Sequence, residues 1–294
     1  MAIDWYSYII RGGIKIMALV RVDFFSEKLM RTVTINAIVP IDKMTFEGMQ
    51  VREKKPFKTL YLLNGMFGNY TDWVAGTRIQ AWAQERNLVV IMPSGENKFY
   101  VDNINSGDLF GQFIGEELVE KTRDLFPLST KREDTYIGGL SMGGYGSLVN
   151  GLKYHETFSH ICALSPALIL DMVLNSSNNA EMPVFRRCYF ETIFGNIDEL
   201  IGSDKDYKAL ITKLIEEKVE LPKIWISCGT EDTSLINQTR DYRDFLRDNN
   251  VEFTYVEGPG AHDWEFWDLH ILKAMDWLPL ENITKSIHSG NVGK

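Results

Sequence analysis

The sequence predicts an α/β fold, with a mainly parallel central sheet, helices on both faces of the sheet and a small cap insertion. Two short runs, at 59–63 and 88–92, are apolar throughout, which is typical of strands covered on both faces. Stretches with helical periodicity separate most of the expected strands, and this alternation favours parallel pairing. A length of 294 residues suits one large sheet. Ligand sites in such sheets lie at the carboxyl ends of the strands.

The composition is that of an ordinary globular protein, with 45% hydrophobic and 24% charged residues. The formal net charge of −9 and the absence of any Lys/Arg run argue against a nucleic-acid partner. The three cysteines, Cys162, Cys188 and Cys228, show no C-x-x-C spacing. The sequence therefore predicts neither a zinc site nor a redox pair.

The chain is expected to form a single domain over residues 17–280. Residues 1–16 are interpreted as an N-terminal extension and residues 281–294 as a polar tail. Charged residues interrupt the apolar runs near the N-terminus, so these runs predict neither an export signal nor a membrane span. The missing export signal predicts a cytoplasmic location.

The elements follow in order along the chain. The first two strands, at 20–25 and 31–40, alternate in polarity and are expected to pair antiparallel. Beyond the two buried runs, further strands are expected at 135–139, 160–165, 223–228 and 251–256. Helices are expected at 73–83, 108–126, 142–158, 207–217, 235–249 and 265–278.

Residues 167–204 break the alternation of strand and helix. Irregular insertions of this length usually carry function or are mobile, so we expect a cap or lid over the site. The alternative is an insertion that has no function.

The segment Gly139-Leu140-Ser141-Met142-Gly143 joins a β-prone run to a helical pattern. Strand, sharp turn and helix with serine at the apex are typical of a nucleophile elbow. The turn strains the serine backbone, and its neighbours two positions away must be very small. A glycine-rich turn that binds nothing is the alternative, while a Walker phosphate loop would need a Gly-Lys-Ser/Thr ending that is absent.

A serine nucleophile needs a base, and the chain offers five histidines. His262 follows the last expected strand in a glycine-rich loop, where a catalytic histidine is expected. The other four lie at the far end of the elbow helix, inside the last helix or in the tail: His155, His160, His270 and His288. The alternative is that His262 lies at the start of a helix and has no catalytic role.

The acid is expected after a strand between Ser141 and His262. Asp232 follows the strand at 223–228 and is our choice, with Glu231 and Asp263 as competitors. Asp232 could also serve as a helix N-cap, and the two roles are compatible. The oxyanion hole is expected from two backbone amides, those of Met66 and Met142.

Together these pieces resemble the esterase D/putative esterase family of α/β-hydrolases. The likeness is closest to bacterial tributyrin esterases and related acetyl and feruloyl esterases, and S-formylglutathione hydrolases are more distant. The matching stretches are 17–25, 62–73, 92–103, 138–146, 228–235 and 258–267. The resemblance implies Ser141 as nucleophile, Asp232 as acid, His262 as base and the Met66 and Met142 amides as the oxyanion hole. Many relatives have His-Gly where this chain has Asn64-Gly65.

We therefore expect a serine carboxylesterase that cleaves short-chain acyl esters, acetylated or feruloylated carbohydrate among them. Such chemistry needs no metal or cofactor. A thioesterase of the S-formylglutathione hydrolase type, an acyltransferase and a binding module without catalysis are the alternatives. The residues expected as pocket walls are Phe67, Trp73, Phe99 and Tyr100, although aromatic residues are more often plain core. The sequence leaves the natural ester and the oligomeric state open.

Overall fold

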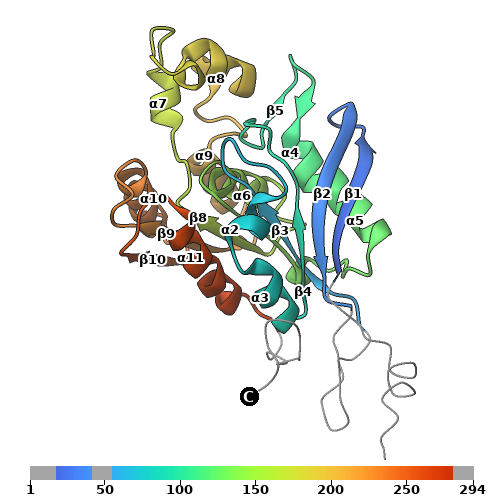
Figure 1. Ribbon diagram of the computed structural model, residues 1–294. Helices are drawn as coiled ribbons and strands as arrows, with labels where there is room; N and C mark the ends of the chain where they lie inside the picture. The colour runs from blue at the N-terminus through green and yellow to red at the C-terminus, as the bar shows by residue number, and fades with distance from the viewer. Residues whose placement is uncertain (1–17, 42–54, 281–294) are drawn as a thin grey trace, which may run out of the picture.

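The computed structural model describes residues 18–41 and 55–280 (Figure 1). The expected N-terminal extension and the polar tail lie outside these residues. The central sheet has the strand order β1-β2-β4-β3-β7-β8-β9-β10. Its strands are β1 (Ala18–Ser26), β2 (Arg31–Val39), β3 (Lys58–Leu63), β4 (Leu88–Met92), β7 (Thr135–Leu140), β8 (His160–Leu164), β9 (Lys223–Gly229) and β10 (Phe253–Gly258).

The sheet is parallel from β4 to β10, as the alternation of elements predicts. Strand β2 pairs antiparallel with both β1 and β4, so the antiparallel opening pair is confirmed. A second sheet of two short strands, β5 (Asp102–Asn103) and β6 (Asp108–Leu109), was not predicted.

Helices cover both faces of the large sheet. On one face lie α2 (Asp72–Gly76), α3 (Ile79–Glu85) and α11 (Trp264–Trp277), in front of the sheet in Figure 1. On the other lie α5 (Leu118–Leu125), α6 (Met142–Lys153), α9 (Tyr207–Glu216) and α10 (Ile236–Asp248). Side chains of β3 alternate between the two layers: Tyr61 and Leu63 join one core, and Leu60 and Leu62 the other. This double burial explains the continuous apolar run.

The helix expected over 108–126 is observed as three joined pieces. A short helix, α4 (Phe110–Gln112), leads into a π-helical turn at Phe113–Glu117 and then into α5. The π-turn directs the buried Glu117 carboxylate at the β1–β2 turn, where it accepts hydrogen bonds from Ser26 Oγ and from the Glu27 amide. This contact fastens the antiparallel edge of the sheet to the helical layer.

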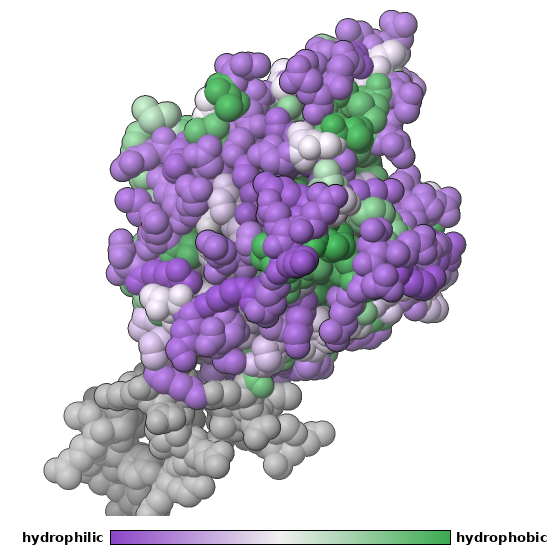
Figure 2. Space-filling model, turned by 180° about the vertical axis from the view of Figure 1, so that it is seen from behind, coloured by the Kyte–Doolittle hydropathy of each residue, from purple (hydrophilic) through white to green (hydrophobic). Residues whose placement is uncertain are grey.

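Residues 167–204 hold two helices, α7 (Leu170–Leu174) and α8 (Arg187–Phe194), which stand at the upper end of the molecule in Figure 1. Short 3₁₀ turns at Pro183–Phe185 and Ile197–Glu199 accompany them. The opposite view in Figure 2 is mostly hydrophilic, with hydrophobic side chains in separate areas. Over the described ranges 18–41 and 55–280, no helix combines the length and apolar character needed to cross a membrane.

Candidate active site

Ser141 stands at the turn between β7, which ends at Leu140, and α6, which begins at Met142. Its backbone has φ 54° and ψ −118°, a conformation that residues with side chains rarely adopt. A Cβ at position 139 would lie 2.5 Å from the Gly143 carbonyl, and one at 143 would lie 2.4 Å from the Leu63 carbonyl oxygen. The two glycines are therefore required by backbone packing, as the elbow motif predicts.

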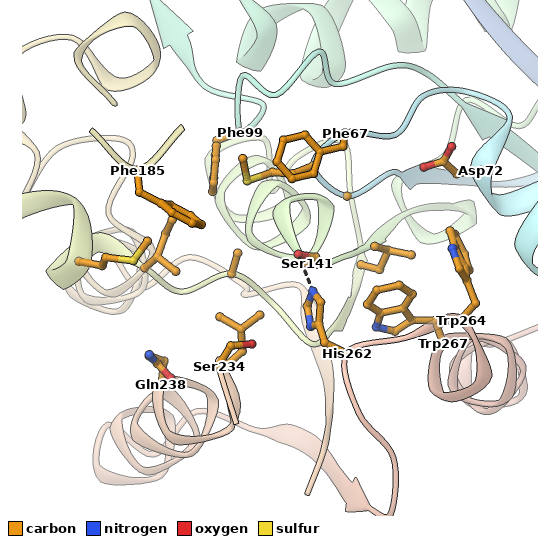
Figure 3. A pocket seen from close by; sticks show the side chains of 17 residues that line it. Phe67, Asp72, Phe99, Ser141, Phe185, Ser234, Gln238, His262, Trp264 and Trp267 are labelled. Carbon is orange, nitrogen blue, oxygen red and sulfur yellow. Dashed lines mark hydrogen bonds between the residues drawn. The ribbon is translucent and has the colours of Figure 1, made fainter. Parts of the chain in front are cut away.

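Ser141, His262 and Asp232 form a continuous chain of hydrogen bonds. The Nε2 atom of His262 lies 3.0 Å from Ser141 Oγ, and its Nδ1 atom lies 2.7 Å from Asp232 Oδ2. Figure 3 shows the serine and the imidazole facing each other across the floor of a pocket. The three side chains come from loops that follow β7, β9 and β10, all at the carboxyl ends of parallel strands.

The Asp232 carboxylate is wholly buried, whereas 32% of the His262 side chain is exposed. Burial by itself would raise the pKa of Asp232, but hydrogen bonds from His262 and Ser234 outweigh it and hold the pKa below its usual range. The second carboxylate oxygen accepts from Ser234 Oγ at 2.7 Å and from the Leu235 amide at 3.2 Å. Asp232 thus fixes the turn that leads into α10, but the N-cap of that helix is Leu235, so the capping alternative for Asp232 was wrong.

Two competitors for the acid have other partners. The Glu231 carboxylate accepts hydrogen bonds from the Gly260 amide and from Thr230 Oγ1. Asp263 caps α11 by accepting from the Phe266 amide at 3.0 Å. Only Asp232 of the three carboxylates hydrogen-bonds the His262 ring among the described residues.

The loop after β3 lies directly beside Ser141. A Cβ built on Gly65 would be 3.5 Å from Ser141 Cβ, and Met66 lines the same pocket. Buried Asn64 fixes this loop, because its Oδ1 accepts from the Gly95 amide at 3.1 Å and from Tyr100 Oη at 3.0 Å. The Met142 amide begins α6, where a first-turn N–H has no acceptor inside the helix.

The pocket above Ser141 has a volume of about 440 Å³. Phe67 lines it, as predicted, with 69% of its surface exposed. Apolar side chains from the segment after β8 contribute to the lining: Ala167, Ile169, Met172 and Phe185. The remaining lining comes from Gly65, Met66, Asp72, Phe99, Leu140, Ser141, Ser234, Leu235, Gln238, His262, Trp264 and Trp267.

The expectations for Trp73 and Tyr100 were wrong, because both side chains are buried in the core and neither lines the pocket. Trp73 donates from Nε1 to the Leu63 carbonyl at 3.0 Å. Tyr100 lies beneath the loop after β3 and supports it through Asn64. Phe99, which is also expected in the wall, does line the pocket, and so does Asp72, the neighbour of Trp73 in sequence.

Sequence reasoning missed the pocket roles of Asp72, Trp264 and Gln238. Asp72 is the first residue of α2 and directly precedes the buried Trp73. A signal was present for Trp264, since it lies two positions after His262 at a strand's carboxyl end. Over the described residues, no cluster of His, Cys, Asp and Glu side chains could hold a metal ion.

Comparison with known proteins places this geometry in a family. A family model described as "Putative esterase" matches residues 27–278. An acetyl esterase of Caldicellulosiruptor saccharolyticus is 44% identical over 262 residues, covering 89% of this chain and 98% of the relative. The serine hydrolase FphF of Staphylococcus aureus is 30% identical, with a TM-score of 0.78 over 90% of this chain and 98% of that one.

A second solved structure, the S-formylglutathione hydrolase FrmB of Staphylococcus aureus, is also 30% identical. Its TM-score is 0.76, over 89% of this chain and 98% of that one. A ferulic acid esterase at 20% identity and a TM-score of 0.66 shares the fold. The chain therefore belongs to this esterase family, and it is a carboxylic ester hydrolase with an α/β-hydrolase fold.

Proposed function

We propose that the protein is a serine esterase for short-chain acyl esters, with Ser141 as nucleophile, His262 as base and Asp232 as acid. The hydrogen-bonded chain from Ser141 through His262 to Asp232, at the floor of a pocket, is the observation that carries the proposal. Along the chain the nucleophile comes first, then the carboxylate and then the base, which is the order expected for an α/β-hydrolase.

In the acylation step, His262 Nε2 takes the Ser141 proton as Oγ attacks the ester carbonyl carbon. The buried Asp232 carboxylate holds the Nδ1–H tautomer and stabilises the imidazolium that forms. The tetrahedral oxyanion accepts hydrogen bonds from the Met66 and Met142 amides. The C–O bond to the alcohol then breaks, and His262 gives its proton to the leaving oxygen.

Deacylation repeats the cycle with water in place of the alcohol. His262 takes a proton from water, the hydroxide attacks the acyl carbon, and the acid leaves as Ser141 regains its proton. The apolar side formed by Ala167, Ile169, Met172 and Phe185 favours an alkyl group over a charged one. We assign the acyl group to this side, and residues 167–204 to a cap within a single domain over 17–280.

Hydrolysis of p-nitrophenyl esters from acetate to decanoate tests the proposal. Wild type should cleave acetate and butyrate fastest, and Ser141→Ala should reduce the rate to background. Ser147→Ala is a matched control, because Ser147 is buried in α6, the helix that follows Ser141, and its hydroxyl donates to the Gly144 carbonyl. Equal rates for wild type and Ser141→Ala would refute the nucleophile.

Two further measurements distinguish ester hydrolysis from acyl transfer and from thioester hydrolysis. Added acceptor alcohols should not change the free acid released per ester cleaved if water is the acceptor. A preference for S-formylglutathione over aryl acetates would assign the protein to the thioesterase activity named for its relative FrmB.

A further inference from the structure

Asp72 is the only acidic residue among the described residues that line the pocket, and no Lys or Arg lines it. Figure 3 places Asp72, Trp264 and Trp267 on one side of Ser141, and Phe185, Ser234 and Gln238 on the other. The side opposite the apolar cap residues therefore carries a carboxylate and two indole rings. A substrate group that carries a positive charge or donates a hydrogen bond meets a carboxylate only on this side of the described pocket.

One oxygen of the Asp72 carboxylate has no hydrogen-bond donor among the described residues. The Oδ1 atom accepts from the Asn69 amide at 3.1 Å, while Oδ2 lies against the backbone of Gly68 and accepts from no hydrogen-bond donor among the described residues. Burial raises the pKa of Asp72, and no neighbouring cation offsets the effect. A half-buried carboxylate without a cationic partner favours a ligand that brings its own hydrogen-bond donor.

Trp264 provides an apolar surface in the same pocket, against the helix that begins with Asp72. Its ring packs edge-on against Trp73 and Trp267, at 5.6 and 5.2 Å between centroids, and lies against Gly76 at the end of α2. Asp72 begins that same helix, so α2 positions both the carboxylate and the indole. An aromatic face next to a carboxylate suits a ring or chain with an apolar body and a donor at its tip.

The leaving group is the part of the ester that extends toward this side. The leaving oxygen must come within hydrogen-bond reach of His262 Nε2 to be protonated. Trp267 packs edge-on against the His262 ring, with 4.8 Å between the ring centroids. Trp264 packs in turn against Trp267 and extends this aromatic surface toward Asp72 (Figure 3). The acyl group then occupies the apolar cap side.

We propose that Asp72 and Trp264 form a leaving-group subsite that accepts a hydrogen-bond donor, either a hydroxyl or an ammonium group, and rejects an anion. This inference rests on the proposed esterase function and narrows its substrate class. It predicts esters of alcohols that carry a second hydroxyl or an amine, and it disfavours leaving groups with carboxylates.

Four acetate esters built on one six-membered ring test the subsite. Cyclohexyl acetate has no polar tip, trans-4-hydroxycyclohexyl acetate carries a hydroxyl, 4-acetoxypiperidine an ammonium, and trans-4-acetoxycyclohexanecarboxylate an anion. Wild type should show a kcat/KM roughly tenfold higher for the hydroxyl and ammonium esters than for cyclohexyl acetate, the ratio expected from one hydrogen bond to a charged acceptor. The anionic ester should be slowest.

Asp72→Asn keeps an oxygen that can accept from the Asn69 amide and removes the charge. It should abolish the advantage of the ammonium ester and relieve the penalty on the anionic ester, each relative to cyclohexyl acetate. Glu265→Gln is the matched control, because Glu265 is exposed on α11 outside the pocket and changes the net charge equally. Its ratios should equal those of wild type.

Unchanged ratios in Asp72→Asn would overturn the subsite, as would a wild-type preference for the anionic ester. Either result leaves the esterase proposal standing, because that proposal depends on p-nitrophenyl acetate hydrolysis and its loss in Ser141→Ala. Loss of the Ser141 dependence would instead remove both.

Discussion

The Leu63 carbonyl leaves no room for a side chain at position 143. A Cβ there would lie 2.4 Å from the Leu63 oxygen and 2.7 Å from the Asn64 oxygen, both backbone atoms that cannot rotate away. Gly143→Ala should therefore displace the loop that carries the Met66 amide. We expect a loss of about 1–3 kcal/mol in the free energy of unfolding from overpacking, and about a hundredfold loss in kcat from a misplaced oxyanion donor.

Gly258→Ala is the control for this prediction, because a Cβ at that position has no heavy atom within 4 Å. Urea unfolding and p-nitrophenyl acetate kinetics on both variants measure the difference. Equal effects of the two substitutions would contradict the packing argument.

At single residues, sequence reasoning works best where chemistry restricts the choice. Ser141, Asp232 and His262 are each expected at a strand's carboxyl end, and the structure joins them by hydrogen bonds. Pocket walls are harder, because neighbouring side chains point to opposite sides of a loop or helix. Trp73 enters the core while Asp72 lines the pocket, and only tertiary packing decides between them.

The loops after β9 and β10 are joined by a pair of reciprocal hydrogen bonds. The Glu231 amide donates to the Gly260 carbonyl at 3.0 Å, and the Gly260 amide donates to the Glu231 carboxylate. Gly260 lies two positions before His262, so this link holds the imidazole loop against the loop that carries Asp232. Glu231 is a positioning residue in this arrangement.

Glu231→Ala should lower kcat about tenfold with little change in KM, because the base is displaced while the pocket walls remain. Glu231→Gln retains an oxygen acceptor for the Gly260 amide and should recover most of the lost rate. Steady-state kinetics of both variants on p-nitrophenyl acetate provide the comparison. An equal loss in the two variants, or a change confined to KM, would argue against a positioning role.

Most helices and strands follow from periodicity, but their interruptions do not. The helix expected over 108–126 contains a π-turn, which adds one residue to a single turn and leaves the spacing of Phe110, Phe113 and Ile114 almost unchanged. The turn is explained by Glu117, whose buried carboxylate meets a hairpin distant in sequence. Local sequence periodicity contains no information about a hydrogen-bond partner 90 residues away, such as Glu27 for Glu117.

Two buried histidines link the stability of the whole molecule to pH. Desolvation lowers the pKa of His160 and of His270 to about 4, with nearby cations adding to the shift. In the unfolded chain each takes up a proton near pH 6.5, while the folded protein does not until about pH 4. The folded state is therefore fully favoured above pH 6.5 and loses stability as the pH falls toward 4.

Between pH 4 and pH 6.5, each histidine should make the free energy of unfolding rise by about 1.4 kcal/mol per pH unit. His270→Phe should reduce the slope by one such contribution, because a phenyl ring can keep the stacking on Phe266 and does not titrate. Urea denaturation from pH 7 to pH 4.5 gives the slopes. A variant with the wild-type slope would show that His270 is protonated in the folded state.

The segment between β8 and α9 forms one wall of the pocket but contributes no strand to the central sheet. Ala167, at its start, donates its amide hydrogen to the Ser141 carbonyl, so the segment begins beside the reacting centre. Substitutions in it alter the space available to a substrate without disturbing strand pairing. Evolution can therefore change the substrate range through this segment while the catalytic residues stay the same. For the same reason, the segment is a suitable unit to exchange between relatives when a new substrate range is wanted.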